Sequence, residues 1–328
     1  MLRFGTIGSG WITDEYIHGA LDSGLWQLTA VYSRTEERAR AYADRHGAKL
    51  AFTSVQAMAA STEVDAVYVA SPNALHYQHC KVLLEHGKHV ICEKPITVEP
   101  WQLEELQQLA DQNHLVYMEA LIGVYLPEMK VLQGAVERLG GVHLARFDFS
   151  QYSSKYPAYL RGETPNIFNP AMATGGLMDL GIYCVYPAVM LFGVPDKVSA
   201  HARFLRTGAD GSGCVTLHYA DKTVVLTYSK TAQGVIGSEI QGEHGVIRIP
   251  RISKLTDMTL TPVGGEEQPL SVYTEKYLQM SHEAQAFYRF ITEMPTYQAQ
   301  YRYVQSLALS VNRVLSQARE AANIRFTD

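Results

Sequence analysis

The stretch that decides the fold is LRFGTIGSGWIT, residues 2 to 13. An apolar, β-rich run leads into the glycine turn GSG, and an amphipathic helical pattern opens at Trp11. Strand, glycine turn and helix in this order are typical of a dinucleotide-binding βα unit. Gly8 permits the tight turn, and Gly10, which lacks a Cβ, lets a pyrophosphate approach the backbone N–H groups of Trp11 and Ile12. An ordinary glycine turn is the alternative.

The sequence shows two successive patterns of predicted secondary structure. Over the first 120 residues, β-rich runs alternate with helical stretches, which predicts a parallel, doubly wound Rossmann sheet. From about Gly140, longer alternating runs predict a large open, mostly antiparallel sheet, with turns at ADGSG (209–213) and QGEHG (241–245). The first set of strands is expected at 2–8, 28–33, 48–52, 64–71, 88–93 and 115–120, and the second at 143–149, 197–205, 213–219, 222–230 and 245–249.

The rest of the chain predicts helices and one long loop. Apolar or amphipathic periodicity indicates helices over about 175–192, 278–292 and 298–322, and the polar stretch 153–170 is a loop of the length often found in lids. We therefore expect an NAD(P)-binding Rossmann domain over 1–120, and an α+β domain for substrate binding and oligomerisation over 121–328. The C-terminal helix is a candidate to pack back on the first domain.

Composition narrows the class of partner. The chain has 328 residues, 28 Lys and Arg against 33 Asp and Glu, and a formal charge of −5, with no basic run to neutralise nucleic-acid phosphates. We see no secretory signal, and the longest nearly apolar run, 180–195, is shorter than the roughly 20 residues of a membrane span. The widely spaced cysteines predict a reducing cytoplasm and neither disulfides nor a zinc site: Cys80, Cys92, Cys184 and Cys214.

The end of the second predicted strand bears on the choice of cofactor. An NAD enzyme usually carries Asp or Glu there to bind the ribose hydroxyls. Here the strand ends at Ser33 and Arg34, with Arg38 one helical turn beyond. The guanidinium groups are suited to a 2′-phosphate, which favours NADP over NAD. A capping box formed by Ser33 and Glu36, with Arg34 simply solvated, is the alternative.

Two motifs supply candidate catalytic groups. Glu93 and Lys94 stand where a buried strand ends, at the rim of the ligand crevice of such a fold. Asp179 and Tyr183 lie four residues apart in the apolar segment GGLMDLGIY, so a helix would place them on one face. Tyrosine is a poor base unless a cation stabilises its phenolate, and Lys94 is a candidate for that cation, for polarising the substrate oxygen, or, with Glu93, for positioning the cofactor. A surface ion pair and a core tyrosine are the alternatives.

With these motifs the chain resembles the glucose-fructose oxidoreductase, inositol dehydrogenase and rhizopine-catabolism family, Gfo/Idh/MocA. The resemblance runs through GTIGSGWIT, VASPNALH (69–76), EKPIT, GGLMDLGIY and IQGEHGVIRI. It implies a nicotinamide-binding Rossmann domain followed by an open sheet that commonly makes oligomer contacts. Tyr183, MEA (118–120) and GIYC (181–184) are closest to the branch of dimeric dihydrodiol dehydrogenases and NADP-linked xylose dehydrogenases.

The resemblance also implies residue roles. Lys94 matches the catalytic lysine, Asp179 the aspartate of the substrate helix, and Tyr183 the proton donor and acceptor. The chain departs from the branch at LIGVYLP (121–127), which lacks its usual arginine, although Tyr125 is placed to keep an aromatic wall for the substrate. The loop and helix start that would lie beside the cofactor contain Ser71, Pro72, Asn73 and His76.

Two further groups have open roles. His76, His79 and Cys80 have a spacing that can share a metal, but no third ligand and open position are evident, so we predict no metal. Tyr152, Tyr156 and Tyr159 in the long loop suit either stacking on a sugar or diol, or tethering a lid.

The sequence thus predicts a hydride transfer, with NADP preferred over NAD, to or from a secondary alcohol or carbonyl of a sugar, polyol or cyclic diol. This hypothesis requires the ammonium of Lys94 and the phenol of Tyr183 to converge near the nicotinamide. We expect a cytoplasmic homodimer or homotetramer joined through the C-terminal sheet, with neither nucleic acid nor membrane as partner. The alternatives are a glycosidase whose cofactor is never released and a dinucleotide-sensing regulator.

Overall fold

The computed structural model describes residues 1–271 and 275–326, and these divide into two compact units. Unit 1 comprises Met1–Tyr125 and Glu275–Leu309, and unit 2 comprises Leu126–Thr274 and Ser310–Asp328. The domain limits expected from the sequence, 1–120 and 121–328, stay a prediction.

Unit 1 is built on a six-stranded parallel sheet in the order β3-β2-β1-β4-β5-β6. All six strands expected from the sequence are present, so the Rossmann prediction is confirmed. The strands are β1 (Leu2–Ile7), β2 (Trp26–Tyr32), β3 (Leu50–Phe52), β4 (Ala66–Val69), β5 (His89–Glu93) and β6 (Tyr117–Ala120). The helices of this unit are α1 (Trp11–Asp22), α2 (Glu36–His46), α3 (Val55–Ala60), α4 (Asn73–Glu85), α5 (Pro100–Gln112), α6 (Ile122–Tyr125), α10 (Lys276–Thr292) and the first part of α11 (Met294–Ala321).

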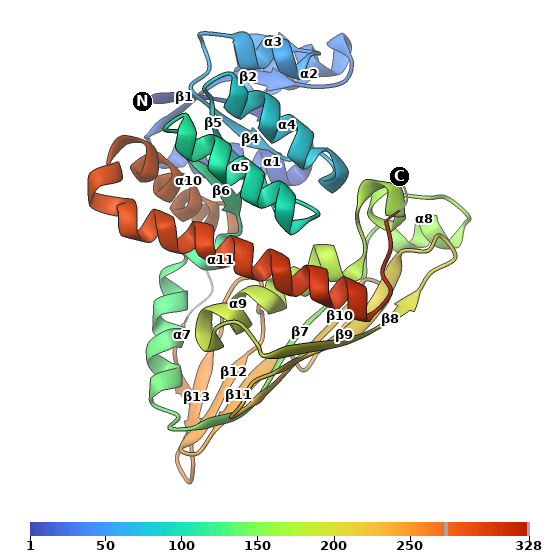
Figure 1. The fold of residues 1–328 in the computed structure, drawn as a ribbon, viewed down its shortest axis with the longest axis vertical. Coiled ribbons are helices and arrows are strands. Elements are labelled where there is room, and N and C mark those ends of the chain that lie inside the picture. The colour runs from blue at the N-terminus through green and yellow to red at the C-terminus, as the bar shows by residue number, and fades with distance from the viewer. Residues whose placement is uncertain (272–274, 327–328) are drawn as a thin grey trace. The chain divides into compact units, whose positions relative to one another are not determined.

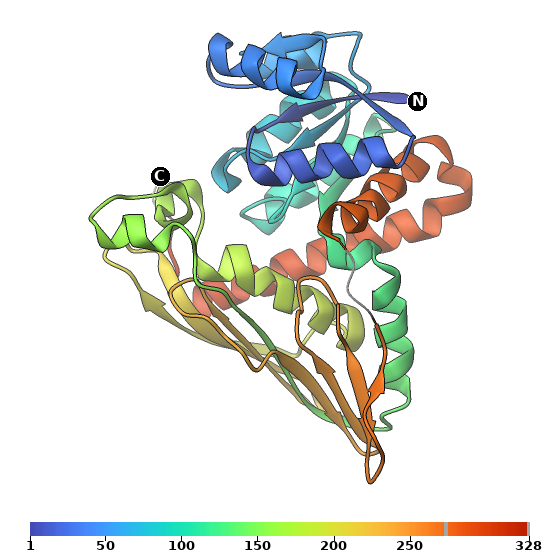
Figure 2. The ribbon, with the colours of Figure 1, turned by 180° about the vertical axis from the view of Figure 1, so that it is seen from behind.

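Helices cover both faces of this sheet, with α4 and α5 on one (Figure 1) and α1 on the other (Figure 2). The strands are buried on both faces and read as nearly continuous apolar runs, as parallel strands do. The face under α1 also receives α10, where the indole N–H of Trp26 donates to the Ala284 carbonyl at 3.0 Å and the Trp26 ring stacks on Phe287. The edge strand β6 is closed by Tyr301, whose hydroxyl accepts the backbone N–H of Tyr117 at 3.0 Å.

Unit 2 is built on an eight-stranded sheet in the order β14-β13-β12-β11-β7-β10-β9-β8, in which only the pair of β7 and β10 is parallel. The mostly antiparallel sheet expected from the sequence is confirmed, and β11, β13 and β14 are added to it. The strands are β7 (Val142–Ser150), β8 (Lys197–Phe204), β9 (Asp210–His218), β10 (Thr223–Ser229), β11 (Ser238–Gly242), β12 (Gly245–Ile249), β13 (Thr259–Pro262) and β14 (Gln268–Pro269). The helices are α7 (Pro127–Glu137), α8 (Tyr156–Leu160), α9 (Ile182–Phe192) and the second part of α11.

One face of the second sheet is packed and the other is open. Buried and exposed residues alternate along β12, where Ile247 and Ile249 point into the core and Val246 and Arg248 point out. The helix α9 lies over the packed face (Figure 1). Among the described residues, one helical stretch, Pro170–Phe192, is long and apolar enough to span a membrane, but 72% of its apolar part is buried inside the structure. Packing in the core therefore accounts for its apolar composition.

Two local predictions in this unit are wrong. The turn between β8 and β9 is not ADGSG but lies at 205–209, where Gly208 takes a φ of 86°, and the residues from Asp210 onward belong to β9. The expected loop 153–170 contains α8 and a short 3-10 turn, Asn166–Phe168, because its aromatic rings pack on one another. Tyr159 is buried and its hydroxyl accepts the backbone N–H of Arg206 at 2.7 Å, so this tyrosine tethers the segment.

Candidate functional site

The carboxyl edge of the first sheet brings the two glycines of the GSG turn to the point where strand order reverses. Chains leaving β1 and β4 run to opposite faces of the sheet, which is where a doubly wound sheet binds its ligand. Gly8 has a φ of 121°, and a Cβ built on it would lie 2.6 Å from the carbonyl oxygen of Ala70. Gly10 is the N-cap of α1, with open space around the position of its missing Cβ.

These observations fit a dinucleotide. The turn approaches the neighbouring strand end so closely that only glycine fits at residue 8, while the helix N-terminus beyond it stays open. Trp11 is 65% exposed at the first position of α1, and Ile12 follows it half-buried. The backbone N–H groups at this end of α1 are those expected to hold a pyrophosphate.

At the end of β2, Ser33 does not form the alternative capping box with Glu36. The N-cap of α2 is Thr35, which makes no side-chain cap bond, and the backbone N–H of Ser33 donates to Phe52. Arg34 and Arg38 are exposed, and neither makes an ion pair with another described residue. Both guanidinium groups therefore remain accessible beyond the strand.

The EKPIT stretch is fixed by hydrogen bonds from the neighbouring strands β4 and β6. The hydroxyl of Tyr68 on β4 donates to Oε1 of Glu93 at 2.5 Å, and Tyr68 is itself stacked on Tyr16 of α1. The backbone N–H of Lys94 donates to Oε2 of Glu93, and the N–H of Ile96 donates to the buried carboxylate of Glu119 on β6. Burial, followed by the charge of Glu93, raises the pKa of Tyr68, so its phenol stays a donor.

His76 connects two of the loops at this edge. Its Nδ1 lies 2.8 Å from the carbonyl oxygen of Pro95, and its Nε2 lies 2.7 Å from that of Ser71. The ring is fully buried, and burial lowers its pKa to about 4. A neutral imidazole carries one N–H, so His76 donates to one of these two carbonyls, and its buried ring lies between the loop after β4 and the loop that carries Lys94. No group of three or more potential metal ligands occurs among the described residues.

Ser71, Pro72 and Asn73 continue this edge. Pro72 is the N-cap of α4, and Asn73 is the first residue of this helix. Nδ1 of His79 lies 3.0 Å from the hydroxyl oxygen of Ser71. Tyr125, at the end of α6, is half-buried, and its hydroxyl donates to the carbonyl of Glu119 at 3.2 Å. The candidate residues that precede position 100 therefore lie along the carboxyl edge of the sheet in unit 1.

In unit 2 the GGLMDLGIY motif forms a π-helical turn, Leu177–Gly181, here called the π-turn, which continues into α9. The paired glycines let this segment approach the sheet, since a Cβ on Gly176 would lie 2.7 Å from the ring of Tyr228. Asp179 and Tyr183 are the two residues between 175 and 189 that are not buried. They form the accessible part of an otherwise apolar segment, and the ring of Tyr183 meets Phe149 edge-on at 5.3 Å.

Sequence reasoning missed two residues that hold this turn. Lys230, directly after β10, forms an ion pair with Asp179, and its side chain is only 4% exposed. Asp210 on β9 accepts the backbone N–H of Leu177 at 2.7 Å, and burial raises its pKa. Lys230 follows the inward phase of β10, with Val224, Leu226 and Tyr228, so a search for charges on predicted buried faces would have found it. Asp210 gave no such signal, because it fell in the predicted turn and is out of phase with the buried residues Val215 and Leu217 of β9.

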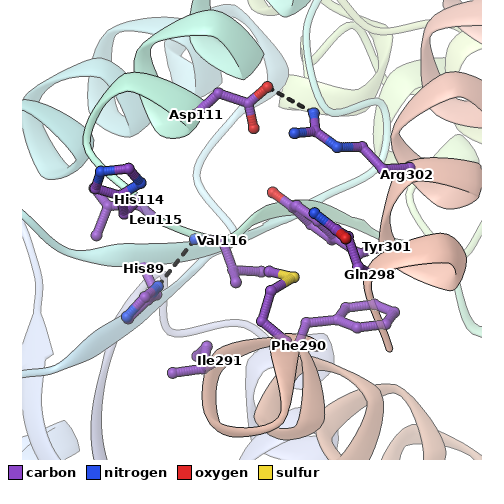
Figure 3. A pocket seen from close by; sticks show the side chains of 11 residues that line it. His89, Asp111, His114, Leu115, Val116, Phe290, Ile291, Gln298, Tyr301 and Arg302 are labelled. Carbon is purple, nitrogen blue, oxygen red and sulfur yellow. Dashed lines mark hydrogen bonds and ion pairs between the residues drawn. The ribbon is translucent and has the colours of Figure 1, made fainter. Parts of the chain in front are cut away.

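A pocket of about 300 Å³ lies elsewhere in unit 1 (Figure 3). It is at the start of β5 and before β6, the edge opposite to Gly8 and Glu93, and none of the predicted site residues lines it. Nδ1 of His89 accepts the N–H of Val116 there, and Asp111 pairs with Arg302 at 2.7 Å. The lining residues are His89, Asp111, His114, Leu115, Val116, Phe290, Ile291, Met294, Gln298, Tyr301 and Arg302. We do not assign it to the cofactor, because ligands of this fold bind at the carboxyl edge.

Comparison with known proteins agrees with this geometry. Residues 2–121 match the oxidoreductase family with an NAD-binding Rossmann fold, and residues 135–248 match the GFO/IDH/MocA C-terminal domain. The chain therefore belongs to the Gfo/Idh/MocA family, as predicted. It is an NAD(P)-dependent oxidoreductase that acts on CH–OH groups, which confirms the predicted class of enzyme and cofactor.

Individual relatives align over almost their whole length. The chain is 39% identical to scyllo-inositol 2-dehydrogenase (NADP(+)) IolU of Bacillus subtilis over 99% of this chain and 98% of that one. It is 27% identical to trans-1,2-dihydrobenzene-1,2-diol dehydrogenase of Mus musculus over 99% and 98% of the two chains. The fold is that of KijD10, a 3-ketoreductase from Actinomadura kijaniata in complex with NADP and TDP-benzene, with a TM-score of 0.85 at 22% identity and 98% coverage of both chains.

The glycine turn yields a test of the site. Gly8→Ala should lower the free energy of unfolding by about 1–3 kcal/mol, because alanine must keep a left-handed backbone against the Ala70 carbonyl. Gly10→Ala is the matched control for stability, with an expected change of about 0.5 kcal/mol or less and weaker binding of NADPH. Urea denaturation and NADPH fluorescence titration measure the two quantities. Equal unfolding free energies for the two variants would contradict the role given to Gly8.

Proposed function

We propose that this enzyme transfers hydride between NADP and a secondary alcohol or carbonyl of a sugar, polyol or cyclic diol, with cyclic polyols as the first candidates. The observation that carries the proposal is the 39% identity, over nearly the whole of both chains, with an NADP-linked scyllo-inositol 2-dehydrogenase. The more distant relative acts, by its name, on a cyclic diol. Both names describe ring compounds with secondary hydroxyl groups.

The proposed cofactor residues lie along the carboxyl edge of unit 1. The N-terminus of α1 with Gly8, Gly10, Trp11 and Ile12 would hold the pyrophosphate. Ser33, Arg34 and Arg38 would take the 2′-phosphate of the adenosine ribose. The nicotinamide half would rest beside the segments after β4 and β5: Ser71, Pro72, Asn73, His76, Glu93 and Lys94.

The proposed chemistry uses three side chains. The nicotinamide, when bound, supplies or accepts the hydride. Oη of Tyr183 takes the proton from the substrate hydroxyl during oxidation and returns it during reduction. The ammonium of Lys94 stabilises the phenolate or polarises the substrate oxygen. Asp179 orients the substrate by accepting a hydrogen bond from a hydroxyl, and Tyr125 contributes to the wall of the substrate site.

Two features support these roles. Asp179 and Tyr183 are the accessible residues of an apolar segment, which is unusual for side chains that only pack. The backbone around Lys94 is held by Glu93, Glu119 and His76, so this lysine extends from a fixed loop. A regulator that only senses a dinucleotide has no need of this arrangement.

The proposed chemistry is tested with a panel of cyclic polyols, aldoses and diols, read by NADPH absorbance. Lys94→Met and Tyr183→Phe should each lower kcat/KM by about 100-fold or more while NADPH still binds, because each removes a group that acts in proton transfer. Lys49→Met, an exposed lysine before β3, is the control and should keep wild-type turnover. Near-normal turnover in either variant refutes its assignment. Glycoside cleavage without net NADPH change would identify the glycosidase instead.

The cofactor preference is tested at the end of β2. Arg34→Asp should move the preference from NADP towards NAD, because the carboxylate repels a 2′-phosphate and accepts bonds from ribose hydroxyls. Arg40→Asp makes the same charge change on the following helix, α2, and should leave the ratio of kcat/KM values with NADP and NAD unchanged. An unchanged ratio in Arg34→Asp would remove this arginine from the cofactor site.

We further propose a cytoplasmic homodimer or homotetramer joined through the open face of the second sheet. Leu144 and Val246, 39% and 36% exposed, both lie opposite Gln241 on neighbouring strands, so they share that face. Leu144→Glu should shift the wild-type oligomer towards monomer in light scattering. Leu160→Glu, at an exposed leucine of α8, should not. A monomeric wild type would end this part of the proposal.

The proposed cytoplasmic location is compatible with the cysteines, since all four are free thiols.

A further inference from the structure

The backbone of Lys230 is fixed on both sides. Its N–H donates to the carbonyl of Gly211 at 2.8 Å, and its carbonyl accepts the N–H of Ser153 at 3.0 Å. The residue directly follows β10, in phase with the buried side chains of Val224, Leu226 and Tyr228. The direction of the lysine side chain, into the packed face of the sheet, is therefore set by the strand.

The side chain carries a charge into this packed face. An ammonium that is 4% exposed costs several kcal/mol to desolvate unless it has a counterion, and Lys230 finds one in Oδ2 of Asp179. Asp179 is 35% exposed, so one partner is buried while the other reaches the accessible part of the π-turn. A buried cation stabilises the ionised form of a neighbouring carboxylate.

Other titratable groups stand on the elements packed against the π-turn. They are His143, Arg146 and Asp148 on β7, Asp210, Cys214 and His218 on β9, Tyr228 on β10, and Tyr183, Cys184 and Tyr186 on α9. The two carboxylates of this set, Asp148 and Asp210, are engaged with other donors, since Asp148 accepts from Ser150 and Thr227, and Asp210 accepts from Leu177. Among the described residues, Lys230 forms an ion pair with Asp179 and with neither Asp148 nor Asp210.

A buried ion pair is weak evidence for stability, because apolar residues of similar volume often serve the fold as well. Here one member of the pair is the carboxylate that stands one helical turn before Tyr183. The cation on its inner side keeps that carboxylate in the state that accepts hydrogen bonds, and it limits the directions that the side chain takes. Both effects act on a group with access to substrate.

We propose that Lys230 is a positioning residue of the hydride-transfer reaction: it holds Asp179 ionised and oriented, so that Asp179 accepts a hydrogen bond from a substrate hydroxyl. The inference rests on the proposed function of Asp179. Lys230 itself does not touch substrate or cofactor in this scheme. Its whole effect passes through Asp179.

A double-mutant cycle tests this dependence. Lys230→Met should lower kcat/KM for the polyol by about 10- to 100-fold, because a misplaced or protonated Asp179 binds the substrate poorly. The same substitution in an Asp179→Asn background should cause no further loss, and Lys230→Arg should recover part of the activity. The Kd for NADPH should stay at its wild-type value in all variants. Lys222→Met, which removes a lysine paired with Asp221 just before the same strand, is the matched control.

The outcomes separate the two proposals. Wild-type kcat/KM in Lys230→Met, or losses that multiply in the double variant, would overturn the role of Lys230 alone. A wild type that turns over none of the polyols would overturn the proposed function and this inference together. If Lys230→Met does not fold, the double variant, which leaves no uncompensated charge, is compared with Asp179→Asn. Equal activity then supports the positioning role, and a further large loss overturns it.

Discussion

The arrangement of unit 1 depends on one close approach of two backbones, that of Gly8 to Ala70. The end of β1 and the end of β4 are joined there by the N–H of Ala70, which donates to Ile7 at 2.7 Å. A side chain at residue 8 would clash with Ala70 and push the two strand ends apart. The crevice of a doubly wound sheet exists only where such neighbouring ends diverge to opposite faces.

From that point the edge of the sheet is connected by polar contacts to the EKPIT loop. His76 joins the loop after β4 to Pro95, and Glu119 of β6 accepts the N–H of Ile96. Each contact is made by a buried group, so water does not compete for it. The position of the loop that carries Lys94 is thus set by residues of helix α4 and of strand β6.

Much of this organisation was predictable because it follows from local patterns of apolar residues and glycines in the sequence. The six parallel strands, the glycine turn and the apolar segment around Asp179 each have a signal within a dozen residues. The partners of that segment do not. Lys230 and Asp210 lie 51 and 33 positions away from the residues they hold, and only the folded sheet brings them there. The misplaced turn has the same origin, since Asp210 is polar by composition but buried by its contact with Leu177.

The pair of Lys230 and Asp179 also constrains how this sequence can drift. Loss of Asp179 alone would leave the Lys230 ammonium in a poorly solvated place, and loss of Lys230 alone would remove that counterion from Asp179, whereas loss of both leaves no buried charge. Descendants of this chain should therefore retain both residues or replace both together, because a chain that keeps only one of the two is less fit. We therefore expect these two positions, although distant in the chain, to change together in evolution.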